Sequence, residues 1–578
     1  MRGLGKRTTN FKIQKKMSSR SEALDLSQTF EKMKNPDPDL RYMATSDLNV
    51  SLGKMKGKKF IDNEQREIMS GLLTLLTDEA NDVKDITIKC LSSFMPFVTS
   101  VSAVKSLVEK LKTMLLDAKK ALDVNRDVAL EVIKRTIKII VINKEFKLVL
   151  TDNFSVPLLN FFKTPLAELS DISIGFNLDV LEVIIRQIGA TLDVSRVVKT
   201  LTPFLSEGVF ANRRRTVQCL AQLSKYANDT QMEEIIVPSF EAMKKSTNKE
   251  QSKVYVLLYS TIASVSKEKC GKYLTTCFEL LRVKFTAVED DSEDDLKEAI
   301  LNAFNLFIVN CPNQLSNEVA KEILKYVVQF LQYDPNRFDD DEEEDDANAM
   351  EEEEDDEEVF EDEDDITWKL RKLSGDCLVS LVKERSDMFC EVVSEALSVV
   401  LKRFKESVEI VLNIVLGVYS LVLKTVNSGV CQCVEKVRES VSGAIPQIES
   451  ILKGKKSTEK SKMECFNIVK EIAVFDGAAL VPHVNTLEGV IVTLLNSANS
   501  HVELLSTMCE CLRNIVKING VDSFSAAISP VLVSLFDSKN FRVEIEVLKT
   551  ESVLLRYAKS AEMYTTLNVG SVKAALVT

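Results

Sequence analysis

The chain has 578 residues, more than one hydrophobic core can organise, because single cores stop growing at roughly 250–300 residues. It therefore forms several domains or one extended array. Aromatic residues make up only 7% of the chain, with 18 glycines and 12 prolines, and this composition disfavours strand-rich domains, which need frequent turns. The remaining text, rich in Leu, Val, Ile and Lys, predicts an all-α protein.

The net charge of −13 is concentrated in one place, since 21 of the 27 residues from Asp339 to Asp365 are Asp or Glu. Without that acidic segment, 74 basic residues face 66 acidic ones, so the rest of the chain is mildly basic. Nucleic-acid binding requires Lys and Arg clustered on one face, and we expect no nucleic-acid partner. A mildly basic body fits an acidic partner or the chain's own acidic segment.

Residues 1–20 are basic and lack the apolar stretch of a secretory signal, so we expect a disordered N-terminal extension. No apolar run approaches the ~20 residues needed to cross a bilayer, and no membrane partner is expected. The twelve cysteines lie mostly in apolar stretches predicted to be helical, and no CxxC motif occurs. Both features are typical of reduced thiols in a protein core. A cytoplasmic and nuclear location is therefore expected.

From residue 21 onward a phrase recurs: an apolar helix, a short polar turn, and a second helix with apolar or small residues at i, i+4 and i+8. Lys or Arg usually occupies i+1, where a local ion pair with an Asp of the turn is expected. Clear copies begin at Leu40, Val83, Asn125, Asn212, Leu296 and Leu370. Adjacent copies lie about 40–45 residues apart, the spacing of HEAT or armadillo units. We predict a superhelical solenoid of about twelve HEAT helix pairs, in which neighbouring pairs bury each other's apolar stripes.

The acidic segment interrupts the eighth predicted pair. Repeats 1 to 8 (first part) are assigned to residues 21–335, a disordered acidic loop to 336–366, and repeats 8 (second part) to 12 to 367–578. Dense like charges repel and bury nothing, so the loop is expected to hang from the edge of the stack as a tether. A second interpretation is electrostatic contact with a basic partner or groove. No EF-hand calcium loop is present.

The sequence gives no indication of catalysis. His483 and His501 are the two histidines, and neither lies near a nucleophile motif of the Gly-x-Ser-x-Gly type. Neither a GxxxxGK[ST] phosphate loop nor a GxGxxG motif occurs, and no spacing of His and Cys suits a metal. We predict a non-enzymatic chain without cofactor or metal.

Several phrases, in the right order, resemble the cullin-associated, neddylation-dissociated proteins. The phrases are Phe30-Glu31-Lys32-Met33 with Asp39-Leu40-Arg41-Tyr42-Met43-Ala44, then Asp294-Asp295-Leu296-Lys297-Glu298, then Tyr333-Asp334-Pro335-Asn336 followed by the acidic segment and Trp368-Lys369-Leu370-Arg371-Lys372, and finally Arg403-Phe404-Lys405-Glu406 and Cys465-Phe466-Asn467. The most distinctive element is the combination of YDPN, the acidic segment and WK. The resemblance runs from about residue 21 to near the end.

The resemblance implies a HEAT scaffold that binds un-neddylated cullin–RING ubiquitin ligase cores and regulates their assembly and substrate-receptor exchange. The N-terminal repeats would embrace the RING-box subunit and the C-terminal region of the cullin. The chain has roughly half the family's length and resembles its N-terminal half, so we expect it to be truncated or completed by a separate C-terminal half. Alone, it is expected to bind the cullin–RING core but to exchange receptors poorly.

Two alternatives stay open. An importin-β-like transport receptor is also a HEAT array with an acidic loop, and binding to a small transport GTPase would identify it. A phosphatase-scaffold-like subunit would have more regular units and no acidic split. For partner contacts, the basic residues of the second helices are the candidates, although packing or turn ion pairs would explain them equally well. They are Arg41, Arg213, Arg214, Arg215 and Arg371.

Overall fold

The computed structural model describes residues 26–55, 59–116, 125–286, 294–333, 367–429, 433–454, 457–497, 502–520, 525–535 and 540–557. All the secondary-structure elements formed by these residues are helices, and no strand occurs among them. They form twelve successive helix pairs, which confirms the prediction of about twelve HEAT units. The N-terminal extension and the acidic loop lie outside the described residues.

The chain divides into two compact units, Met1–Ser266 and Lys267–Thr578, each with six pairs. The helices of the first unit are α1 (Leu26–Met33), α2 (Pro38–Lys54), α3 (Asp62–Leu75), α4 (Asn81–Phe94), α5 (Val101–Leu115), α6 (Asn125–Ile140), α7 (Lys144–Leu150), α8 (Val156–Phe161), α9 (Asp171–Ile188), α10 (Val194–Leu201), α11 (Phe210–Ser224), α12 (Asp229–Lys245) and α13 (Lys249–Ser266). A short π-helical turn, Thr151–Ser155, joins α7 to α8, so these two act as the first helix of one pair.

The helices of the second unit are α14 (Leu274–Thr286), α15 (Asp294–Asn310), α16 (Asn317–Gln332), α17 (Trp368–Glu384), α18 (Phe389–Lys402), α19 (Glu409–Asn427), α20 (Val434–Lys453), α21 (Glu459–Phe475), α22 (Gly477–Leu480), α23 (Val484–Ser497), α24 (Val502–Asn519), α25 (Ser525–Ser534) and α26 (Phe541–Tyr557). The acidic segment lies between α16 and α17, which pack on each other as one pair. The predicted domain boundaries at residues 335 and 367 stay a prediction.

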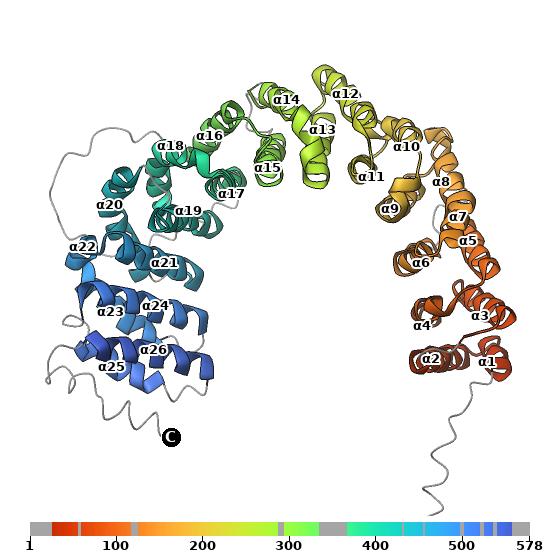
Figure 1. The fold of residues 1–578 in the computed structure, drawn as a ribbon, viewed down its shortest axis with the longest axis horizontal. Helices are drawn as coiled ribbons and strands as arrows, with labels where there is room; N and C mark the ends of the chain where they lie inside the picture. The colour runs from red at the N-terminus through yellow and green to blue at the C-terminus, as the bar shows by residue number, and fades with distance from the viewer. Residues whose placement is uncertain are drawn as a thin grey trace, which may run out of the picture. The chain divides into compact units, whose positions relative to one another are not determined.

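Within each unit the helices form two layers (Figure 1). The second helices contact one another in series, from α2 through α4, α6, α9 and α11 to α13, and from α15 through α17, α19, α21 and α24 to α26. The first helices form the other layer, for example α1, α3, α5 and α7. A second helix is therefore covered by its mate and by both neighbours, which explains why its apolar stripe is wide.

Local sequence sets where many helices begin. The side chains of Ser100, Ser170, Asp193, Ser316 and Thr458 each accept a hydrogen bond from a backbone N–H of the first turn that follows. These residues are good N-caps, because the first N–H groups of a helix have no partner within it. Serine, threonine and aspartate therefore act as N-caps where helices begin between the apolar stretches.

At several repeats the basic residue at i+1 of a second helix reaches forward to the next pair, a contact that the expected ion pair within the local turn did not include. The guanidinium of Arg41 binds Asp78, 37 residues on, and Arg371 binds Glu406, 35 residues on. Arg126 donates to Ser173 of α9. The reason is geometric: side chains near the start of one second helix lie beside the turn that precedes the next one. The motif therefore joins repeats.

Two segments are long and apolar enough to cross a membrane by length and composition, Glu409–Asn427 and Gly477–Leu495, so the expectation that no such segment exists is wrong on that count. The first is α19, whose window is half buried inside the stack between α17 and α21. Core helices of repeat proteins satisfy the same criterion, because they are covered on several sides. The observation is weak evidence for a membrane span.

Candidate interaction surfaces

The five predicted partner-binding arginines all lie on second helices: Arg41 on α2, Arg213, Arg214 and Arg215 on α11, and Arg371 on α17. They do not converge on one site. The first four belong to the first unit, with Arg41 separated from the α11 group by several pairs, and Arg371 belongs to the second unit. Their availability to a partner differs greatly, and the contacts of each side chain decide it.

Arg41 is engaged by its own chain. Its Nε and Nη2 donate to both carboxylate oxygens of Asp78 at 2.7 and 2.8 Å, and its Nη1 donates to the carbonyls of Asn35 and Pro36, both at 2.8 Å. Its side chain is 15% exposed. The residue therefore ties the turn after α1 to the turn between α3 and α4, and little of its hydrogen-bonding capacity remains for a partner.

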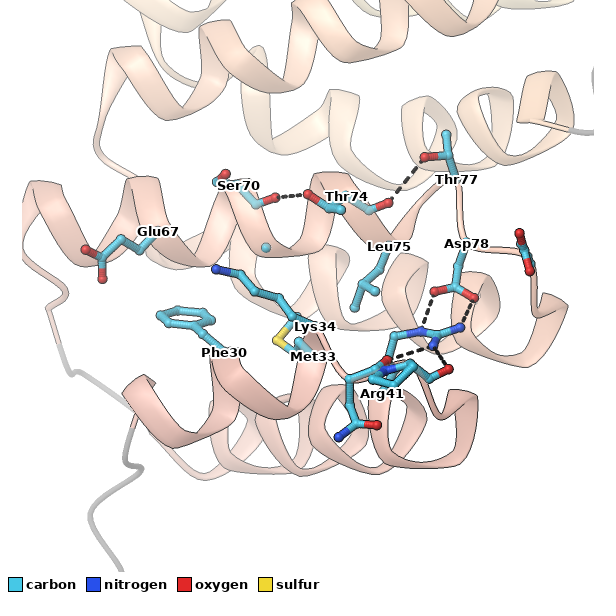
Figure 2. A pocket seen from close by; sticks show the side chains of 14 residues that line it. Phe30, Met33, Lys34, Arg41, Glu67, Ser70, Thr74, Leu75, Thr77 and Asp78 are labelled. Carbon is cyan, nitrogen blue, oxygen red and sulfur yellow. Dashed lines mark hydrogen bonds and ion pairs between the residues drawn. The ribbon is translucent and has the colours of Figure 1, made fainter.

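A groove of about 920 Å³ opens beside this ion pair, between α1 and α3. Figure 2 shows Phe30 and Met33 of α1, and Lys34 just after it, facing Ser70 and Thr74 of α3, with the Arg41–Asp78 pair at one end. A Cβ added at Gly71 would make ordinary van der Waals contact with Phe30 and Met33, 3.6 Å from each. The groove could not be expected from the sequence, because it depends on how α1 packs against α3.

The α11 arginines differ among themselves. Arg213 donates to the carbonyl of Gly208 at 3.0 Å and to Gln251 at 3.4 Å, with a side chain 15% exposed. Arg215 pairs with Asp179 at 3.0 Å and keeps 41% of its side chain exposed. Arg214 is exposed, and no hydrogen bond or ion pair to it is recorded from the described part of the chain. Arg214 and Arg215 are thus the two predicted residues whose guanidinium groups face solvent.

Arg371 is a structural residue. Its side chain is 2% exposed, and it binds Glu406 through two hydrogen bonds of 3.1 Å and Thr367 through one of 2.7 Å. A partner cannot reach this guanidinium while the fold is intact. The packing interpretation therefore holds for Arg371, and partner binding through the arginines is left as a prediction for Arg214 and Arg215.

The α2 helix carries a second feature that sequence analysis missed. Ala44 and Leu48 are buried against the stack, whereas Leu40, Met43 and Val50 are 38%, 59% and 50% exposed. Spacings of three, seven and ten residues place these three exposed side chains along one face. The available signal was that α2 has apolar residues on more than one face.

Within the described residues, no group of three or more His, Cys, Asp or Glu side chains could hold a metal ion. His483 Nδ1 lies 2.9 Å from a carboxylate oxygen of Glu449. Nine of the eleven described cysteines are buried, whereas Cys390 and Cys433 are partly exposed. Burial raises the pKa of Cys90 to about 12 and that of Cys311 to about 11, so these thiols are poor nucleophiles.

Thiol labelling of the native chain is therefore expected to be slow at the nine buried cysteines. At pH 8 a maleimide should modify Cys390 and Cys433 within minutes, while Cys90, Cys311 and the other buried thiols should react only after denaturation. Mass spectrometry of digested samples, taken before and after adding urea, measures this. Fast labelling of Cys90 in the native chain would contradict the packing described for α4.

The Arg41–Asp78 pair should give stability that depends on pH. Burial tends to raise the pKa of Asp78, but hydrogen bonds from Arg41 and from the N–H of Ala80 outweigh it, and the pKa lies below its ordinary value of 3.8. A lowered pKa in the folded state stabilises the fold above the unfolded pKa, and this contribution is lost as the pH falls through the lowered value. We expect Asp78→Asn to lower the Tm by about 2–4 °C at pH 7. The difference from wild type should shrink below pH 4, and a difference independent of pH would argue against the ion pair.

Fold and surfaces together define a class: a HEAT-type helical-repeat scaffold that offers extended surfaces for protein contacts. No protein-family model matches the chain. It is 26% identical over 500 residues to the Cullin-associated NEDD8-dissociated protein 2 of Mus musculus, covering 83% of this chain and 39% of that protein. It is 27% identical over 565 residues to the Cullin-associated NEDD8-dissociated protein 1 of Arabidopsis thaliana, covering 93% and 44%. The resemblance to this family is thereby confirmed, and the chain spans less than half the length of these relatives.

Solved structures of similar fold include yeast importin-β and the karyopherin Kap121p. Yeast importin-β (Kap95p) superposes with a TM-score of 0.65 at 9% identity, covering 96% of this chain and 64% of that one. Kap121p superposes with a TM-score of 0.57 at 12% identity, covering 95% and 54%. At such low identity this likeness concerns the fold alone. It confirms the HEAT architecture and carries no argument for transport.

Proposed function

We propose that the chain is a scaffold that binds un-neddylated cullin–RING ubiquitin ligase cores and regulates their assembly and substrate-receptor exchange. The observation that carries the proposal is the sequence similarity over 83–93% of the chain to proteins named for cullin association and NEDD8 dissociation. The stacked helix pairs supply the extended surface that such a partner needs. A non-enzymatic role and a cytoplasmic and nuclear location are part of the same proposal.

A pull-down tests the proposal directly. The chain, immobilised through a tag, is offered a purified cullin–RING-box complex in the un-neddylated and in the neddylated form. We expect retention of the un-neddylated complex and a loss of at least tenfold in affinity for the neddylated one. Equal retention of both forms, or of neither, would contradict the proposal. Retention of a small transport GTPase instead would favour the importin-like alternative.

Receptor exchange is expected to need more than this chain, because the chain spans less than half the length of its curated relatives. A preassembled ligase with a labelled substrate receptor, mixed with excess unlabelled receptor, reports exchange as loss of label. We expect the chain alone to accelerate this loss little. Acceleration on adding the remaining half of a relative would support the two-part scheme, and full activity of the chain alone would refute it.

The exposed arginines of α11 give a residue-level test. Arg214→Glu with Arg215→Glu reverses two charges on the second-helix layer, where the side chains face solvent. Lys163→Glu with Lys199→Glu is a matched control on the first-helix layer of the same unit. If the second-helix layer binds an acidic surface of the partner, only the α11 variant should weaken binding, by about tenfold at low salt. Equal effects of both variants would indicate non-specific charge attraction.

A further inference from the structure

The C-terminal end of α16 is capped by arginines from later elements. Arg403 donates through Nε to the carbonyl of Leu331 at 2.8 Å and through Nη2 to that of Gln332 at 2.6 Å. Arg371 donates through Nη1 to the carbonyl of Tyr333 at 3.4 Å. The last carbonyls of a helix have no partner within it, and the helix dipole places negative potential there. Two guanidinium groups satisfy both needs at the point where the chain leaves α16.

Glu406 joins the two arginines into one buried cluster. Its carboxylate accepts two hydrogen bonds of 3.1 Å from Arg371 and lies 3.4 Å from Nη1 of Arg403. The side chains of Arg371 and Glu406 are each 2% exposed, and that of Arg403 is 7% exposed. Such a cluster is tolerated only because each charge is paired and hydrogen-bonded. Both arginines also donate to the carbonyl end of α16.

The same cluster brings the two ends of the interrupted pair together. Nη1 of Arg371 donates both to the carbonyl of Tyr333 and to the hydroxyl of Thr367, at 3.4 and 2.7 Å. Two oxygen atoms that accept hydrogen bonds from the same nitrogen lie within about 6 Å of each other, less than the length of two extended residues. Tyr333 and Thr367, the described residues on either side of the acidic segment, therefore lie beside each other in the stack.

A third arginine, Arg385, connects α16 and α17 at the opposite end of the pair. Arg385, just after α17, donates to the carbonyl of Leu315 at 2.8 Å and to the side chain of Asn317 at the start of α16. Its guanidinium is held in turn by Asp387, at 2.8 Å. The antiparallel helices α16 and α17, which lie side by side in Figure 1, are thus joined by buried polar contacts at both ends.

We propose that the cluster of Arg371, Arg403 and Glu406 is a non-covalent splice, which keeps the helix stack continuous through this pair whatever the covalent connection between residues 333 and 367. The acidic segment is then a separable module. Cutting it, removing it or binding a partner to it leaves the stack, and the surfaces that the stack presents, unchanged.

Two variants of the full chain test the splice. One carries a protease site in place of residues 345–351 and is cleaved after purification. The other lacks residues 339–365. Residues 334–338 and 366 then form a linker of six residues between Tyr333 and Thr367. We expect the cleaved halves to co-elute in gel filtration at micromolar concentration. The deletion variant should melt within about 3 °C of the wild-type chain.

Arg403→Gln, made in the cleavable chain, tests the cluster itself, with Arg438→Gln as the matched control. Arg438 belongs to the same unit, has a side chain 49% exposed and pairs with Asp476 away from the cut. Affinity between the cleaved halves should fall about 100-fold for Arg403→Gln, because the carbonyls of Leu331 and Gln332 lose the charged donor that reaches them across the cut, and less than threefold for Arg438→Gln. The uncut Arg403→Gln chain, checked by circular dichroism, establishes that the variant folds.

Three results would overturn the splice. The cleaved wild-type halves could separate, the deletion variant could melt more than 10 °C below wild type, or the two arginine substitutions could weaken reassociation equally. None of these results bears on cullin binding, which depends on the surfaces tested above. Failure of the splice and failure of the proposed function are therefore distinguishable.

Discussion

Glu406→Ala is expected to destabilise the second unit by about 3–5 kcal/mol. The carboxylate accepts hydrogen bonds from both Arg371 and Arg403. Its removal takes a counter-charge away from two guanidinium groups whose side chains are 2% and 7% exposed. Loss of a counter-charge in a desolvated site is among the largest single-site penalties in a folded protein.

The decrease is measured as the shift of the urea midpoint of the second unit. Glu435→Ala is the matched control, since Glu435 also pairs with an arginine, Arg438, but its side chain is 78% exposed. Surface ion pairs contribute little, so the control should stay within about 0.5 kcal/mol of wild type. Similar losses for the two glutamates would show that burial of the cluster has no energetic consequence.

Phe304→Ala is expected to cost about 3–5 kcal/mol, through a cavity between α14 and α15. The Phe304 side chain is fully buried, and its ring lies 5.4 Å from that of Phe278 and 6.2 Å from that of Phe285, centroid to centroid. Aromatic pairs at such separations add to the burial of apolar area. Neighbouring helices are held by many contacts and relax only partly into the space left behind.

Denaturant unfolding monitored by circular dichroism measures this loss. Phe304→Leu should recover most of the stability, because it refills much of the volume with apolar atoms. Phe541→Ala is the exposed control: Phe541 is 67% exposed and should change stability by less than about 0.5 kcal/mol. A small effect of Phe304→Ala would mean that the pair between α14 and α15 is loosely packed.

The helical class and the repeat could be predicted because both depend on local periodicity. Apolar residues at i, i+4 and i+8 recur through second helices such as those beginning at Asn81 and Asn125, and capping residues mark many of the starts. The number of pairs follows from the same spacing. The expectation that no apolar segment is long enough to cross a membrane was wrong for a related reason. The helix α19 is covered on several sides and is therefore apolar around most of its circumference.

The roles of the arginines could not be predicted in the same way. Arg41, Arg213 and Arg371 occupy the same position of the repeat phrase, yet Arg371 alone of the three is fully buried. What differs lies far along the chain: Glu406 follows Arg371 by 35 residues, and the carbonyl of Tyr333 precedes it by 38. A single repeat phrase contains no information about these partners.

The sequence by itself determined the helices, their pairing in series and the family that the chain resembles, because these depend on periodicity and on short phrases of neighbouring residues. The tertiary structure alone decided which basic residues face solvent, where the groove beside Gly71 opens, and how the pair around the acidic segment is joined. The physical reason is the forward reach of one repeat to the next. Side chains of similar local sequence acquire different environments when partners about 35 residues away bring charge, a carbonyl or a gap beside them.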